Sequence, residues 1–334
     1  FSFCRNRTAR GVSRLTGTGV VPRSTEVLFS VLLGIHIDPG FRAFVLIILI
    51  ARIYRRHSMQ VVDAQVHIWR ANTPEHPWPK DHIKPHSETP FGCAELVAEM
   101  DAVGVHRAVL VPPMWQGDSN DYALDAARLH PGRFAVMGRL DLEAPDSRAQ
   151  IAAWRNQPGM LGIRLVPRRQ PLRAQFAAGG IDWLWAEAEK AGVPLMVLID
   201  TDQADLMAQI LIRHPQLKIV LDHLCLPSGA KDEQAFATLD KVLAMAKYPN
   251  VAVKASSMPS FTTDRYPFQR IHAHLRRVYD AYGPRRMFWG TDLSHIPCTY
   301  RQALTLFTEE LDWMRSVDKE WIMGRGICEW IGWP

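Results

Sequence analysis

From residue 59 onward the chain alternates between two patterns of apolar and polar positions. Short runs rich in β-branched and aliphatic residues predict strands, and segments with apolar residues three and four apart predict helices. The first expected strand ends at residue 67, and seven more cover 107–111, 134–140, 161–166, 194–199, 217–222, 251–255 and 286–290. Expected helices cover 94–103, 120–129, 147–155, 183–191, 204–213, 234–246, 269–281, 300–313 and 319–330. Eight strand–helix units predict an α/β fold, a parallel (β/α)8 TIM barrel followed by a C-terminal helix.

The first expected strand carries polar residues at every second position. Asp63, Gln65 and His67 alternate with β-prone residues such as Val62 and Val66. Side chains two positions apart on a strand point to the same face, so the three polar groups are expected to point together. Inside a barrel such groups need polar partners, which indicates a site for chemistry. A solvated strand face is the alternative.

The charge of the chain is distributed unevenly. Residues 1–58 hold nine of the 39 basic residues and two of the 34 acidic ones, so this segment carries a net +7. The remainder holds 30 basic and 32 acidic residues and is mildly acidic. The overall charge of +5 therefore gives no support for nucleic-acid binding. Five scattered cysteines without Cys-x-x-Cys spacing indicate reduced thiols and a cytoplasmic protein.

Residues 1–58 differ from the rest and allow three interpretations. An Arg-rich, acid-poor segment resembles a targeting extension. Its apolar runs at 27–35 and 44–51 could form a membrane hairpin, although each is shorter than the roughly 20 residues of a spanning helix. The third and favoured interpretation is upstream sequence without a role, with the fold beginning at Met59. The domain prediction is therefore an extension over 1–58 and a barrel over 59–334, with no membrane association for the latter.

The first strand is followed by a long loop, residues 70–92, that contains three histidines. His76, His82 and His86 lie there beside Trp78 in a Pro-Trp-Pro sequence. A loop of this length in a compact domain is typical of a lid or binding segment. Surface histidines on a proline-rich loop are the alternative.

Polar residues recur where the other expected strands end, the face that carries active sites in TIM barrels. They are Trp115 after strand two, Arg164 in strand four, Asp222 at the end of strand six and His223 after it, Lys254 in strand seven and Asp292 after strand eight. A lone arginine among apolar neighbours, as at 164, requires an anionic partner.

Three motifs resemble the amidohydrolase-related branch of the amidohydrolase superfamily. They are Asp-x-x-x-His-Ile-Trp at 63–69, Leu-Asp-His-Leu at 221–224 and Phe-Trp-Gly-Thr-Asp at 288–292. Residues 322–330 also resemble the C-terminal helix of that branch, so the resemblance spans 59–334. It implies a barrel enzyme such as a lactonase, or a decarboxylase of the aminocarboxymuconate-semialdehyde type.

Two departures from the family pattern bear on metal binding. Strand one of the family usually reads His-x-His, whereas this chain has Gln65-Val-His67, and strand five ends in Asp200 where the family has histidine. Only His67 and Asp292 of the family's metal ligands are kept. A catalytic zinc normally has three protein ligands and a water. We therefore expect no metal cofactor, with zinc or manganese on His67 and Asp292 as the alternative.

The resemblance implies a hydrolase that opens a lactone or ester of a small carboxylated substrate. In this hypothesis Asp292 is the general base and His67 and His223 orient the substrate and polarise its carbonyl. Gln65, Trp115, Arg164 and Lys254 are the expected substrate-binding residues, the last two for a carboxylate or oxyanion. A metal-dependent decarboxylase and a non-catalytic barrel that binds a small acid are the alternatives. A homo-oligomer is possible from the sequence.

Overall fold

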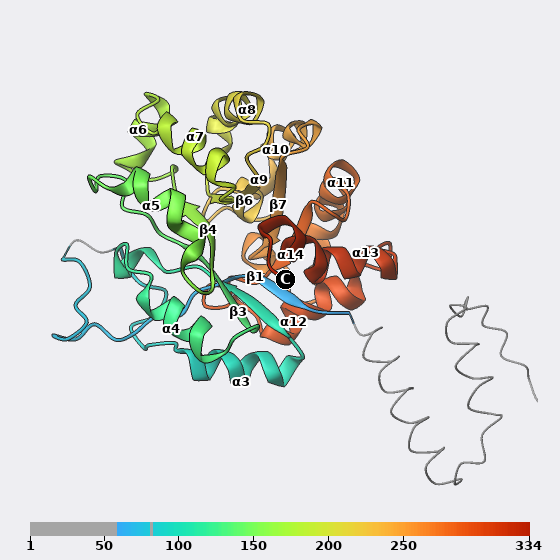
Figure 1. Ribbon diagram of the computed structural model, residues 1–334. Coiled ribbons are helices and arrows are strands. Elements are labelled where there is room, and N and C mark those ends of the chain that lie inside the picture. Colours follow the sequence, from blue (N-terminus) through green and yellow to red (C-terminus); the bar gives the residue numbers. More distant parts are fainter. Residues whose placement is uncertain (1–58, 81–82) are drawn as a thin grey trace, which may run out of the picture. The chain divides into compact units, whose positions relative to one another are not determined.

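Eight parallel strands form a barrel in the computed structural model, which describes residues 59–80 and 83–334. Each strand pairs with the next in chain order (Figure 1). The strands are β1 (Val62–Val66), β2 (Arg107–Leu110), β3 (Phe134–Gly138), β4 (Met160–Leu165), β5 (Leu195–Val197), β6 (Ile219–Leu221), β7 (Val251–Ser256) and β8 (Met287–Gly290). Past the end of β8 the chain returns to β1, where the Asp292 N–H donates to the Gln65 carbonyl at 2.8 Å. The predicted TIM barrel is confirmed, while the expectations for residues 1–58 lie outside the described residues.

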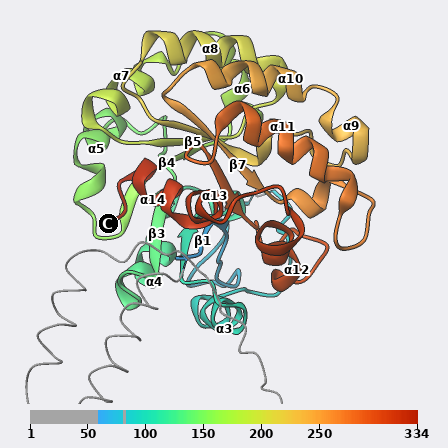
Figure 2. The same cartoon turned by 90° about the vertical axis from the view of Figure 1, so that its right-hand side faces the viewer.

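Helices follow the strands and surround them, and Figure 2 shows α5 to α11 in an arc around the sheet. The larger ones are α3 (Cys93–Val103), α4 (Asp121–Leu129), α5 (Ser147–Ala153), α7 (Asp182–Ala191), α8 (Ala204–Arg213) and α11 (His272–Tyr282). Shorter ones are α6 (Leu172–Ala177), α9 (Asp232–Phe236), α10 (Leu239–Ala244) and α12 (Tyr300–Thr305). Helices α3 and α7 end as expected at Gly104 and Gly192, which take the left-handed conformation that glycine adopts without strain.

Some of the expected helices are interrupted in the structure, and one helix was not expected. The helix expected over 234–246 is divided into α9 and α10, and Thr238 between them hydrogen-bonds through its hydroxyl to Thr201 at 2.8 Å. The helix expected over 300–313 ends as α12 and continues as a π-helical turn, Leu306–Glu310. Helix α6 was not expected, because 172–177 is too short to show helical periodicity.

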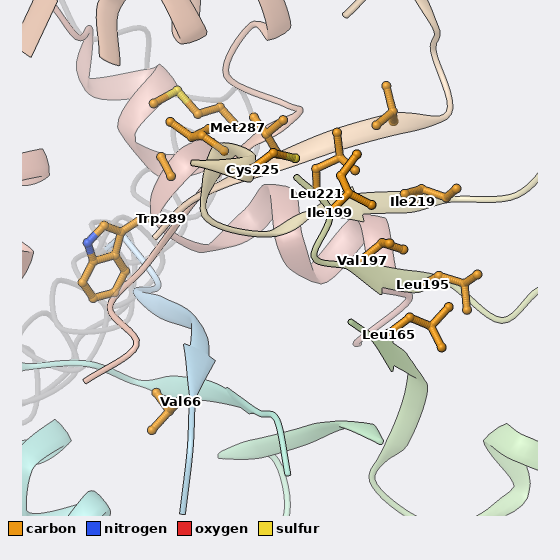
Figure 3. Close-up of a cluster of buried hydrophobic side chains, with 14 of the residues drawn as sticks. Val66, Leu165, Leu195, Val197, Ile199, Ile219, Leu221, Cys225, Met287 and Trp289 are labelled. Carbon is orange, nitrogen blue, oxygen red and sulfur yellow. The ribbon is translucent and has the colours of Figure 1, made fainter. Parts of the chain in front are cut away.

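Strand side chains alternate between two apolar layers, which is why most strands read as continuous apolar runs. The outer layer lies between strands and helices, and burial of each large apolar side chain there typically contributes about 1.5–3 kcal/mol. Figure 3 shows part of this layer, including Val66, Leu165, Leu195, Val197, Ile199, Ile219, Leu221, Met287 and Trp289. A smaller cluster fills the interior with Val62, Ala64, Met196, Ala252 and Phe288.

The C-terminal segment closes the end of the barrel opposite the strand ends that carry polar residues. It consists of α13 (Ser316–Glu320), a π-helical turn (Trp321–Arg325) and α14 (Gly326–Ile331). Ile327 and Ile331 of α14 belong to the interior cluster. At Gly324 a Cβ atom would lie 2.1 Å from the Gln60 carbonyl oxygen, so only glycine permits this close approach to the chain just before β1. The described part of the chain contains no helix with the length and apolar character needed to cross a membrane.

Candidate active site

A pocket of ≈ 170 Å³ opens at the C-terminal ends of the strands. Its wall combines histidines, arginines and one aspartate with apolar side chains. The lining residues with polar or ionisable side chains are His67, His86, Trp115, Arg164, Arg168, Arg169, His223, Ser228, Ser257, Ser260, Asp292 and His295. The sequence-predicted residues His67, Trp115, Arg164, His223 and Asp292 are thus brought together at the expected face of the barrel.

The backbone at two strand ends takes conformations that L-residues rarely adopt. His223 and the two residues after it have φ values of 50°, 52° and 54°, and Asp292 has φ 56°. Such left-handed conformations persist only where the surroundings enforce them, and they cluster at functional sites. At Asp292 two hydrogen bonds do so: its N–H donates to Gln65, and its carbonyl accepts from the His295 N–H at 2.7 Å. Both turns direct a polar side chain into the pocket.

Asp292 is the centre of the pocket's polar groups. Its side chain is 9% exposed, with Oδ1 3.3 Å from His67 Nε2 and Oδ2 3.9 Å from His223 Nε2. Oδ1 has no hydrogen-bond partner among the described residues. An unpartnered buried carboxylate oxygen is costly unless a ligand or water completes it. Asp292 Oδ1 is therefore free to accept a hydrogen bond from a bound molecule.

The charge state of this group follows from burial and from the neighbouring charges. Burial lowers the pKa of His67 and of His223 to about 4, although Asp292 acts in the opposite direction. Burial would raise the pKa of Asp292, but the nearby histidines, His67 first, outweigh it and hold that pKa below its usual value. Near neutral pH the pocket thus holds a carboxylate among neutral imidazoles, the state that a general base requires.

The expectation that the three polar residues of the first strand point together is wrong. A β-bulge lies between Asp63 and Val66, and the extra residue of a bulge interrupts the alternation of faces. Asp63 accepts hydrogen bonds from the Thr291 N–H at 2.8 Å and the Tyr300 hydroxyl at 2.9 Å, on the helix side of the sheet. Gln65 instead contacts His67 and Lys254 in the interior. The hydrogen-bond partners of Asp63 therefore lie outside the pocket.

A second group of polar residues lies below the pocket. Asp222 is fully buried, with Lys254 Nζ 2.6 Å from Oδ1 and Arg164 Nε bonded to Oδ2. Burial acts against the charge of Asp222, but Lys254 and Arg164 outweigh it and keep the pKa well below its usual range. Burial lowers the pKa of Lys254, and Asp222 opposes that shift. Lys254 and Gln65 are fully buried and absent from the pocket wall, so their expected direct contact with substrate is not supported.

Two pocket histidines, His86 and His295, were not predicted as site residues from the sequence. His86 comes from the long loop, and its ring centroid lies 4.7 Å from that of Trp115 and 4.9 Å from that of His295. The only sequence signal was the concentration of histidines in that loop. Of the other two histidines in this loop, His76 lies exposed in a turn with Thr73, and His82 is outside the described residues.

Arg169 is another pocket residue without a signal in the sequence. It is exposed, and its guanidinium makes no ion pair or hydrogen bond with the described residues. The neighbouring Arg168, by contrast, is paired with Asp200. Arg164 is bound only through Nε, which leaves its two terminal nitrogens for other partners. The pocket therefore offers the unpaired guanidinium of Arg169 and the two terminal nitrogens of Arg164 to an anionic ligand.

The barrel and this arrangement of carboxylate and imidazoles at its C-terminal face define a class of water-activating barrel enzymes. The chain belongs to the amidohydrolase family, whose model matches residues 62–322. It is 26% identical to an L-fucono-1,5-lactonase of Burkholderia ambifaria over 241 residues, 69% of this chain and 79% of that one. It is 25% identical to a 4-sulfomuconolactone hydrolase of Hydrogenophaga intermedia over 245 residues, 70% of this chain and 74% of that one. The family match and these relatives confirm the resemblance and an enzyme of the hydrolase class.

A solved structure of an amidohydrolase from Burkholderia multivorans shares the fold and was obtained with bound zinc. It has a TM-score of 0.68 and 22% identity, and the match covers 82% of this chain and all of that one. Zinc thus occurs in a protein of this architecture, and the expectation of no cofactor has no support from the comparison. The described residues of this chain contain no group of three or more His, Cys, Asp or Glu side chains placed to hold a metal ion.

Proposed function

We propose that this protein is a hydrolase that opens a lactone ring by general-base activation of water, with Asp292 as the base. The observation that carries the proposal is Asp292 Oδ1, a buried and unpartnered oxygen of a pocket-lining carboxylate, 3.3 Å from His67 Nε2. Two relatives are named as lactone hydrolases. A lactone has a better leaving group than an amide, which suits a site that works with a carboxylate base and imidazoles.

The hydrogen-bond partners of the two Nδ1 atoms assign His67 and His223 different roles. His67 Nδ1 lies 2.6 Å from the Val111 carbonyl, which only accepts, so Nδ1 carries the proton and Nε2 presents a lone pair. His223 Nδ1 lies 2.8 Å from the Ser256 hydroxyl, which can donate to it and leave the proton on Nε2. His223 is therefore the group that donates to the substrate carbonyl. The hydrogen bonds divide a role that the sequence analysis gave to both.

The reaction then proceeds in two proton transfers. Asp292 takes a proton from water as the oxygen attacks the acyl carbon, and His223 Nε2–H stabilises the resulting oxyanion. As the ring C–O bond breaks, Asp292 returns the proton to the leaving alkoxide. The product is the open-chain hydroxy acid.

A negatively charged substituent on the substrate is part of the proposal. Arg169 and the free terminal nitrogens of Arg164 would bind a carboxylate or sulfonate on the lactone. The arginine fork matches the two oxygens of such a group, and no carboxylate of the described residues neutralises Arg169. Among the relatives, the sulfomuconolactone hydrolase is named for an anionic lactone.

We propose further that the reaction is metal-independent, because the residues present do not fit a zinc site. Gln65 stands at a position where an imidazole would be needed, and its amide oxygen is bound to Lys254. His67 Nε2 is itself 3.3 Å from the Gln65 amide nitrogen. No step of the mechanism is therefore assigned to a metal.

Turnover of a lactone panel in ¹⁸O-water, with and without a chelator, tests the proposal. The panel contains neutral aldonolactones, carboxylated and sulfonated muconolactones and pyrone dicarboxylates. We expect one ¹⁸O atom in the carboxylate of the product, chelator-resistant rates and a preference for the anionic lactones. Release of CO₂ from an aromatic carboxylate would identify a decarboxylase instead, and tight binding without turnover a small-acid binder.

A further inference from the structure

Lys254 is a lysine whose ammonium group is enclosed by the barrel. The side chain is fully buried on the inner face of β7, and Nζ donates to Gln65 Oε1 and lies 2.6 Å from Asp222 Oδ1. Met196 Sδ at 3.2 Å and the Ala64 carbonyl at 3.5 Å complete its surroundings. These partners come from different strands, so they meet only in the barrel interior. The adjacent Asp222 carboxylate favours the charged ammonium.

The contact with Lys254 fixes the orientation of the Gln65 amide. An ammonium only donates, so it must face Oε1, and the amide Nε2–H is then directed at His67 Nε2, 3.3 Å away. His67 Nδ1 in turn donates to the Val111 carbonyl. A chain of donors thus runs from Lys254 through Gln65 and His67 to Val111. Within this chain the lone pair of His67 Nε2 faces the N–H group of Gln65.

We propose that Lys254 is the resident cation of this site and that, with Gln65, it excludes a divalent metal ion. A metal could bind His67 only through the Nε2 lone pair that Gln65 occupies. Its charge would also oppose the ammonium, which only one amide group separates from that nitrogen. Lys254 is in this account a positioning residue, because it touches neither substrate nor reacting atoms. The inference deepens the proposed function and rests on its metal-independent character.

Zinc binding by the full chain tests the inference without any substrate. The set is the parent protein, Gln65→His, Lys254→Met, Gln65→His/Lys254→Met and Gln65→His/Lys254→Arg. The readouts are zinc content by elemental analysis after dialysis and zinc affinity by competition with a chromophoric chelator. Lys218→Met is the matched control, because Lys218 lies at a different site, over the Trp330 ring.

We expect the Gln65→His/Lys254→Met protein to retain about one equivalent of zinc and to bind it about 10–100-fold more tightly than the parent, the range by which neighbouring groups alter metal affinity. Gln65→His alone and Gln65→His/Lys254→Arg should retain well under one equivalent, since each keeps the cation. Lys218→Met should match the parent.

Retention of a full equivalent by Gln65→His alone would overturn the inference, and this variant keeps the Lys254–Asp222 ion pair and its contribution to folding. Failure of a folded Gln65→His/Lys254→Met protein to bind zinc better than the parent would overturn it too. A parent that opens no lactone yet shows this zinc pattern refutes only the proposed hydrolysis. A parent that opens lactones in chelator while Gln65→His retains zinc refutes only the role of Lys254.

Discussion

Two layers of buried polar side chains lie at the C-terminal end of the barrel, and they differ in how completely their charges are paired. In the lower layer Asp222 contacts two cations, Lys254 and Arg164. In the upper layer Asp292 faces neutral imidazoles. Oδ1 of both carboxylates lacks a hydrogen-bond partner among the described residues, but only the Asp222 oxygen has a cation beside it, Lys254 Nζ at 2.6 Å. A buried carboxylate with matched cations contributes to the structure of the site, whereas one that lacks them is available to a ligand. We therefore propose that the lower layer holds the upper one in place and that the upper one carries out the chemistry.

Asp292→Asn is the change with the largest expected effect, because it removes the base of the upper layer and preserves its shape. We expect kcat for a lactone substrate to fall by about 10²–10⁴-fold, with little change in thermal stability. Initial rates and melting temperature measure the two effects. His106→Ala is the control: His106 accepts a hydrogen bond from the Val61 N–H at 3.1 Å, at the opposite end of the barrel. Full kcat in Asp292→Asn would show that another group activates water.

Asp222→Asn should lower stability more than it lowers activity, because it leaves Lys254 and Arg164 buried without their carboxylate. Loss of one partner from a buried ion pair costs about 3–5 kcal/mol. We expect a loss of that order in the free energy of unfolding, measured by denaturant titration. Asp200→Asn is the matched control: Asp200 also contacts two arginines, but its side chain is 36% exposed. Exposed pairs contribute about 0–1 kcal/mol. Equal losses in the two variants would contradict the distinction drawn between the layers.

The barrel was predictable from the sequence because it depends on repeated apolar periodicity and on glycines at helix ends. Pocket residues on strand ends, such as His223 and Asp292, were also predictable, because barrel topology fixes where strand ends meet. The β1 bulge that separates Asp63 from Gln65 left no sequence signal. The inward position of His86 depends on how a long loop folds back over the barrel. The roles of the cations could not be predicted either. Whether Lys254 or Arg169 is available to a substrate depends on which of the two has a carboxylate beside it, and the sequence does not show this.

Arg169→Met tests whether an unpaired cation in the pocket recognises substrate. A lost hydrogen bond to a charged group costs about 1.5–3 kcal/mol, so KM for an anionic lactone should rise about tenfold or more. KM for a neutral aldonolactone and kcat for both should change little. Arg173→Met is the control, because Arg173 is already paired with Asp200 and Asp202. An equal rise in KM for both kinds of lactone would argue against an anion-binding role.

The pH dependence of activity should reflect the neutral imidazoles of the upper layer. His67 and His223 have pKa values of about 4 in the folded protein, against 6.5 for free histidine. We expect kcat/KM to stay level through pH 6.5 and to fall only as the pH approaches about 4. The unfolded chain binds protons first as the pH falls below 6.5, so stability should also decline from 6.5 towards 4. A pH–rate profile with parallel thermal melts measures both, and an acid limb centred at 6.5 would contradict the assigned charge states.

Tyr300→Phe should have the smallest effect. It tests whether Asp63, which lies before the β1 bulge, takes part in the chemistry. The Tyr300 hydroxyl donates to Asp63 Oδ2 at 2.9 Å, on the helix side of the sheet. Its removal should lower the free energy of unfolding by about 1–3 kcal/mol, because a buried acceptor loses one of its donors. Burial already raises the pKa of Asp63 to about 6, and loss of the hydroxyl should raise it further. Asp63 keeps the Thr291 N–H and hydroxyl as donors, which places the loss at the low end of that range. Because Gln65 and His67 lie beyond the bulge and contact other partners, kcat and KM should equal those of the parent protein. A fall in kcat at unchanged stability would mean that Asp63 acts on the pocket after all.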